Sequence, residues 1–154
     1  MGLDLVIDDG VALPADLRRQ LRTEVARMIR AAARHDGRAD YDASLRLVDD
    51  AAIHALNRDY RGKNKPTDVL AFAQREGPAG ALHPELLGDV VISVDTARRQ
   101  AKRGLYRELL HLASHGLCHL LGYDHRDDAE ERTMNTRAKA LRAEAGRRGP
   151  VKAA

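Results

Sequence analysis

The feature that most constrains this chain is an apolar helical segment, residues 105–121, that carries regularly spaced histidines and ends at a glycine. His115 and His119 are four residues apart, so on an α-helix they lie on one face. Gly122 is expected to stop the helix, because glycine commonly occupies the position after a helix ends. The chain can then turn back and bring His125 over the last helical turn.

The three histidines predict a metal site. Three imidazoles that converge on one point are what a zinc-type site requires, and three protein ligands leave one coordination position open, as in catalytic zinc sites. We therefore expect His115, His119 and His125 to bind a metal ion. The alternative is that they are ordinary structural histidines, but this spacing around a helix-ending glycine rarely arises by accident.

The sequence gives alternative roles to the neighbours of these histidines. His111 continues the stripe by one turn and is either a ligand or a residue that packs around the site. Glu108 and Asp124 either orient an imidazole by accepting its second N–H or are solvated carboxylates. Cys118 points away from the stripe, so we expect it to be a small buried apolar residue.

The spacing also bears on the reaction. His115, His119, Gly122 and His125 reproduce the His-x-x-x-His-x-x-Gly-x-x-His spacing of the metzincin proteases. In those enzymes a glutamate, the general base, follows the first histidine, whereas this chain has Gly116. The pattern therefore favours a metal-assisted reaction other than ordinary peptide hydrolysis.

A basic, turn-rich segment, residues 57–68, is the second candidate site. Arg61 suits bidentate contact with a phosphate and could stabilise charge that builds on a reacting phosphoryl group. Lys63 and Lys65 suit a diffuse anionic backbone. The alternative is a solvated turn between a helix and a strand, which is the more common role of a charged run.

Composition limits the other classes of function. The chain has 154 residues, 44% of them hydrophobic, which is enough for one domain; we assign it to residues 1–146, with 147–154 as a basic tail. Aromatic residues make up 3%, so a protein that stacks bases on a row of aromatic rings is not expected. One cysteine excludes an intramolecular disulfide. The sequence has no signal peptide or spanning segment, so we expect a cytoplasmic protein.

Apolar periodicity and turn residues predict an α+β fold, a single domain with a small mixed sheet of about four strands and about five helices. The expected strands are residues 3–7, 45–48, 69–73 and 87–94. The first helix follows Pro14 and the second is capped by Asp49 or Asp50. The third is expected to be capped by Asp95 or Thr96 and to end at Gly104, and the fourth and fifth are residues 105–121 and 126–145.

Three segments together resemble the YbeY family of bacterial endoribonucleases. Residues 115–125 read His-Gly-Leu-Cys-His-Leu-Leu-Gly-Tyr-Asp-His, which resembles the signature His-Gly-x-x-His-Leu-x-Gly-Tyr-Asp-His. Residues 57–72 resemble Asn-x-x-Tyr-Arg-x-x-x-x-Pro-Thr-Asp-Val-Leu-x-Phe, and residues 87–93 resemble Leu-Gly-Asp-x-x-Ile-Ser. Cys118 stands where leucine is more usual, and Ala71 and Ala73 replace the common serine and proline around Phe72.

The resemblance implies Zn²⁺ at the three histidines, with Ni²⁺ or another divalent metal as the alternative, and a role for Arg61 in RNA cleavage. It implies maturation of small-subunit rRNA at its 3′ end and ribosome quality control. The implied partners are RNA, the small ribosomal subunit, ribosomal proteins and an assembly GTPase, with no membrane and no DNA.

We therefore predict a metal-dependent endoribonuclease that prefers single strands, with Arg61 clamping the scissile phosphate and Lys63 and Lys65 holding the strand. The sequence shows no obvious general base, and it leaves open whether water or the RNA 2′-OH is the nucleophile. Two alternatives remain: a metal-dependent peptidase or other amidohydrolase, and a non-catalytic ribosome-assembly factor in which the metal only fastens a loop.

Overall fold

A computed structural model describes residues 2–74 and 82–146. Within these residues the chain forms four strands and five helices. The strands are β1 (Leu3–Ile7), β2 (Asp42–Val48), β3 (Val69–Ala73) and β4 (Leu86–Ser93). The helices are α1 (Ala15–His35), α2 (Asp50–Arg61), α3 (Val94–Gln100), α4 (Leu105–Leu120) and α5 (Asp128–Gly146).

The strands form one mixed sheet in the order β1-β2-β4-β3. β1 and β4 both run parallel to β2, and β3 pairs antiparallel with β4 at one edge. The predicted α+β fold with a four-stranded mixed sheet and five helices is thus confirmed. The expected buried run is also present, since Val90, Val91 and Ile92 are at most 4% exposed.

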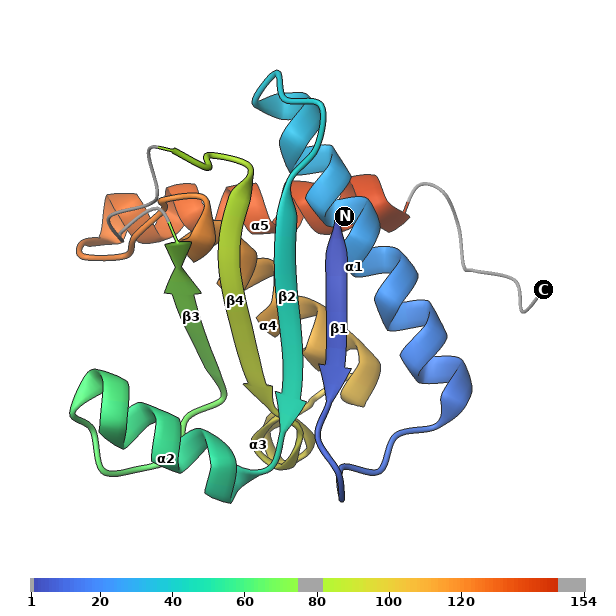
Figure 1. The fold of residues 1–154 in the computed structure, drawn as a ribbon, viewed down its shortest axis with the longest axis vertical. Helices are drawn as coiled ribbons and strands as arrows, with labels where there is room; N and C mark the ends of the chain where they lie inside the picture. The colour runs from blue at the N-terminus through green and yellow to red at the C-terminus, as the bar shows by residue number, and fades with distance from the viewer. Residues whose placement is uncertain (1, 75–81, 147–154) are drawn as a thin grey trace.

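The helices cover the two faces of the sheet unequally. The larger core lies between the sheet and α1, α4 and α5, which Figure 1 shows behind the strands. A small second cluster on the other face packs Ile53 of α2 against Val48, Leu70 and Val91. Successive side chains of β4 point to opposite faces of the sheet. Val90 therefore belongs to the larger core and Val91 to the smaller cluster.

Two expected helix boundaries are wrong. The side chain of Ser93, not Asp95 or Thr96, caps α3 by accepting a hydrogen bond from the backbone N–H of Thr96 at 3.2 Å. α3 ends at Gln100 rather than Gly104, because Ala101 is already extended. Gly104 has a φ of 93° and stands immediately before α4, so it begins the next helix instead of ending this one.

The second helix is capped by Asp49, which accepts from the backbone N–H of Ala52 at 2.9 Å, so the first of the two expected caps is confirmed. α5 begins two residues later than expected, at Asp128. The expected tail, residues 147–154, lies outside the described residues. None of the helices in the described part of the chain has the length and hydropathy of a membrane-spanning segment.

Candidate metal centre

The end of α4 places the histidines as the sequence predicts. Gly122 has a φ of 99°, and its N–H bonds to the carbonyl of His119 at 3.1 Å. The N–H of Tyr123 bonds to the carbonyl of Cys118 at 3.0 Å. These two bonds form a Schellman motif, which reverses the chain after the helix. The following loop therefore returns over the last turn of α4 and carries His125 with it.

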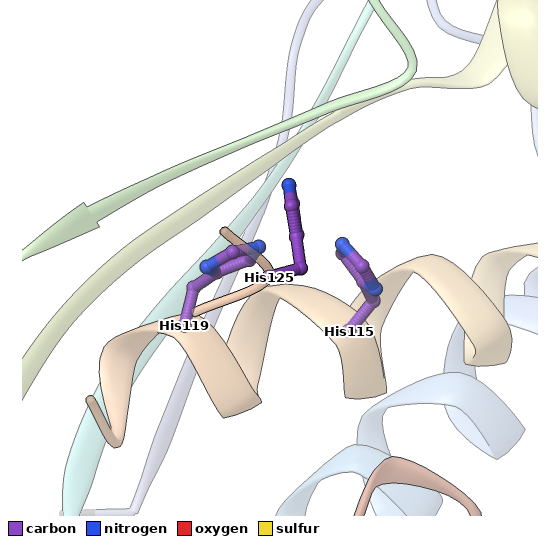
Figure 2. Close-up of side chains that lie close together, drawn as sticks. All are labelled: His115, His119 and His125. Carbon is purple, nitrogen blue, oxygen red and sulfur yellow. The ribbon is translucent and has the colours of Figure 1, made fainter. Parts of the chain in front are cut away.

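The three histidines converge. Each offers one ring nitrogen, and these nitrogens lie within 4.8 Å of one another. The ring of His119 is 4.9 Å from that of His115 and 5.0 Å from that of His125, measured between centroids. Figure 2 shows His115 and His119 rising from the same side of α4, with His125 supplied by the returning loop. The group could hold a metal ion.

Burial keeps two of these imidazoles neutral. It lowers the pKa of His115 to about 4, and the neighbouring charges of His119, His111 and His125 act in the same direction. Burial also lowers the pKa of His119, with further contributions from His125 and Arg61. Only a neutral imidazole can bind a metal ion. Because His115 and His119 are already neutral at neutral pH, neither has to release a proton when a metal binds.

Gly116, between the first two histidines, lets α4 approach the sheet closely. A Cβ atom at this position would lie 2.6 Å from Cγ1 and 3.0 Å from Cγ2 of Val90 on β4. Optimal carbon–carbon contacts are about 3.5–4.0 Å, so no side chain fits without movement. The glycine that replaces the protease glutamate is therefore required by the packing of the helix that carries the site.

The histidines open into a cleft of about 660 Å³. One wall consists of the end of α4 and the loop that follows it, and the other consists of β3 and the segment that precedes it. All six residues predicted from the sequence line this cleft: Arg61, Lys63, Lys65, His115, His119 and His125. The basic segment and the histidine segment are thus two sides of one site.

Arg61 is exposed and held across β3. Its guanidinium donates a hydrogen bond to the backbone carbonyl of Ala71 and lies 5.2 Å from the centre of the Phe72 ring, in cation–π contact. α2 ends at Arg61, within the basic segment, and the following Gly62, with a φ of 70°, reverses the chain. Asn57 stabilises the turn by donating to the carbonyl of Lys65 at 2.9 Å. These contacts hold cationic side chains at the rim of the cleft.

Asp68 also lines the cleft, and it is a functional candidate that the sequence pattern did not single out. It is partly buried, and its charge raises the pKa of His115 against the larger effects that lower it. Gln100 donates from the same nitrogen to Asp68, at 3.0 Å, and to Glu108, at 2.7 Å. The sequence signal was the Pro-Thr-Asp triplet after the basic turn, but only the fold brings it opposite α4.

The structure also places the other neighbours of the histidines. His111 is exposed, its ring is 6.4 Å from that of His115, and it lies outside the converging group. Asp124 accepts from the backbone N–H of His125 at 2.8 Å, which orders the loop, and its charge acts to raise the pKa of His119 against the larger effect of burial. Cys118 is fully buried, as predicted, and burial raises the pKa of its thiol to about 11.

The fold and the cleft define the class: a small α+β protein in which a three-histidine cluster faces a cationic loop. The family model described as Endoribonuclease YbeY matches residues 14–146. The chain is 48% identical over 139 residues to the Endoribonuclease YbeY of Moorella thermoacetica, covering 84% of this chain and 89% of that protein. It is 39% identical over 149 residues to the Endoribonuclease YbeY of Bacillus subtilis, covering 90% and 92%. The chain belongs to the endoribonuclease YbeY family.

A solved structure supports the fold independently. The solution structure of a Thermotoga maritima protein superposes with a TM-score of 0.61 and covers 95% of this chain and 90% of that one. The two sequences are 22% identical, so this likeness concerns the fold alone.

Proposed function

We propose that this chain is a metal-dependent endoribonuclease that cuts single-stranded regions of RNA during maturation of small-subunit rRNA and in ribosome quality control. His115, His119 and His125 bind one Zn²⁺, and Arg61, Lys63 and Lys65 hold the RNA. The observation that supports this most strongly is that one cleft combines converging imidazoles with three cations. Ribosomal proteins and an assembly GTPase are the proposed protein partners, and the cytoplasm is the proposed location.

The donor set fits a divalent transition metal. Imidazole nitrogen is a common ligand of Zn²⁺, and the low pKa of His115 leaves that ring free to bind at neutral pH. Ni²⁺ binds similar sites, so affinity alone does not select the ion. A bound divalent metal supplies Lewis acidity toward oxygen atoms of the substrate or nucleophile.

Arg61 supplies the anion clamp. Its guanidinium carries five N–H donors in a fixed fork that matches two phosphate oxygens, and donors fixed before the reaction stabilise charge that develops in the transition state. Its contacts with Ala71 and Phe72 limit the orientations of the side chain. Lys63 and Lys65 lie on the same wall and attract the flanking phosphates as mobile point charges.

Asp68 is one of two carboxylates that line the cleft, with Asp124, and it is the partly buried one; it can take a proton from the nucleophile. Gln100 donates to its Oδ2 at 3.0 Å and the Thr67 hydroxyl donates to its Oδ1 at 3.4 Å, so the carboxylate is held in place from both oxygens. The chemical groups at the ends of the cleaved RNA distinguish the two candidate nucleophiles, water and the RNA 2′-OH. Attack by the RNA 2′-OH leaves a 2′,3′-cyclic phosphate, whereas attack by water leaves none.

Two features disfavour the peptidase alternative. A glutamate at position 116 would carry the Cβ atom that collides with Val90. In addition, a peptide substrate that added a strand to the outer edge of β3 would need the carbonyl of Ala71, which already accepts from Arg61.

The test is cleavage of an end-labelled rRNA 3′ fragment by metal-loaded protein, with matched histidine variants. His115→Ala removes a proposed ligand, whereas His111→Ala removes an exposed histidine one helical turn away on the same helix. We expect the wild type and His111→Ala to bind about one zinc per chain and cut the fragment, and His115→Ala to fold but do neither. Zinc content is read by elemental analysis and folding by circular dichroism.

The same experiment separates the alternatives. RNA that is bound by the wild type and never cut, together with unfolding of His119→Ala, would favour the assembly factor whose metal only fastens a loop. Cleavage of a protein substrate that is lost in His115→Ala would favour the peptidase. Equal cutting of RNA by the wild type and His115→Ala would show that a contaminating nuclease is responsible.

A further inference from the structure

A groove along α5 has no role in the function proposed above. It has a volume of about 550 Å³ and is lined by Tyr123 and by α5 residues that include Arg132, Thr136 and Arg137. A smaller hollow of about 210 Å³ lies beside it, lined by residues that include Asp36, Gly122, Tyr123 and Arg137.

The groove and the cleft share lining residues. Tyr123 lines the cleft, the hollow and the groove. Gly122 lines both the cleft and the hollow, and Arg137 lines both the hollow and the groove. A strand extended from the cleft past Tyr123 would meet Arg137 next.

The charge of Arg137 helps to lower the pKa of Asp36, but no ion pair joins the two side chains in the described residues. The Nη2 atom of Arg137 is buried without a hydrogen-bond partner there, whereas Arg142, one turn further along α5, donates to Ser114 Oγ at 2.7 Å. The acidic group that faces the hollow is Asp36, whose carboxylate accepts from the Tyr41 hydroxyl at 2.6 Å and contacts the His35 ring at 3.2 Å. A partly desolvated guanidinium of this kind favours an anion beside it.

We propose that this hollow and groove form a second phosphate-binding site for the RNA, beyond the scissile bond. Arg137 and Arg132 hold the backbone phosphates there, and the Tyr123 ring offers a face for one base. The inference rests on the proposed function, because the cleft is what brings an RNA strand to Tyr123. Two arginines, a threonine hydroxyl and an aromatic ring in one channel suit a phosphodiester chain better than an acidic protein surface.

The test compares binding of long and short strands. We would measure the affinity of metal-loaded protein, on ice, for labelled single-stranded 2′-O-methyl RNA of about twelve and about four nucleotides. Arg137→Gln and Arg132→Gln remove the proposed contacts. Arg22→Gln is the matched control, because Arg22 is an exposed arginine of α1 that lines neither the cleft nor the groove.

We expect Arg137→Gln and Arg132→Gln each to weaken binding of the long strand about three- to tenfold and to leave the short strand unchanged. Each should also reduce the slope of log affinity against log salt by about 0.7, the value for one phosphate contact on a single strand. Arg132 is exposed, so its variant tests the proposal even if Arg137→Gln alters folding.

Unchanged binding of the long strand by both variants would overturn the proposal. So would equal losses for long and short strands, because these would indicate a general effect on the protein. The result is separable from the nuclease proposal. A wild type that binds long strands through these arginines and cuts no RNA would refute the nuclease and keep the second site.

Discussion

Gly116→Ala tests the close packing that positions the histidines. The new Cβ would lie 2.6 Å from Cγ1 of Val90, about 1 Å inside the optimal carbon–carbon distance. Val90 is 4% exposed, and its branched side chain has few rotamers, so it cannot move aside easily. Such overpacking costs about 1–3 kcal/mol. Replacing glycine by alanine inside a helix stabilises the folded protein by about 1 kcal/mol. We therefore expect a net loss of up to about 2 kcal/mol.

A double-mutant cycle isolates the contact. In a Val90→Ala background both methyl groups that the new Cβ would strike are gone, so Gly116→Ala becomes neutral or stabilises by up to about 1 kcal/mol. The coupling between positions 90 and 116 then equals the overpacking cost, about 1–3 kcal/mol, which is within the range for contacting residues.

Urea unfolding of the metal-free proteins, followed by circular dichroism, measures the cycle without any contribution from metal binding. In thermal unfolding, each kcal/mol corresponds to about 2–4 °C for a chain of this size. The reasoning fails if Gly116→Ala stabilises the wild-type background, or if its effect is the same with valine and with alanine at position 90.

Four further predictions concern the site and its support. Zinc at a hundredfold excess over Kd should stabilise the wild type and His111→Ala by about 2.7 kcal/mol in thermal unfolding, and it should not stabilise His115→Ala. Equal stabilisation of all three proteins would exclude His115 as a ligand. Arg61→Ala should lower kcat/KM for RNA about 10²- to 10³-fold without changing the melting temperature, and Arg61→Lys should recover part of the loss; unchanged cleavage would remove Arg61 from the site. Gly88→Ala should cost about 3 kcal/mol or more in urea unfolding, because φ is 130° and the added Cβ would lie 2.1 Å from the backbone oxygen of Phe72; near-wild-type stability would contradict this contact. The pKa of His115 is about 4 when folded and 6.5 ordinarily, so between these values the unfolded chain binds more protons. The free energy of unfolding of the metal-free protein should therefore fall as the pH drops from about 6.5 to about 4, less steeply in His115→Asn; an equal slope in that variant would refute the assignment.

The sequence by itself determined the features that depend on neighbours along the chain. The four-residue spacing puts His115 and His119 on one helix face, and Gly122 ends that helix because glycine readily adopts the positive φ of a Schellman turn. The buried strand around Val91 followed from its run of β-branched residues. The histidine and glycine spacing also carries the resemblance to the YbeY family, which the family match supports.

Tertiary structure decided what depends on residues far apart in the sequence. The antiparallel pairing of β3 at the sheet edge brings Arg61 and Asp68 opposite the end of α4, and no local pattern encodes that pairing. The cap of α3 was missed for the same reason. Ser93, Asp95 and Thr96 are all good caps by residue type. The register of β4 selects Ser93, whose hydroxyl also donates to Asp50 of α2 at 2.6 Å. Local sequence fixes the conformation of each segment, whereas the pairing of strands and the packing of helices fix which side chains share a cleft.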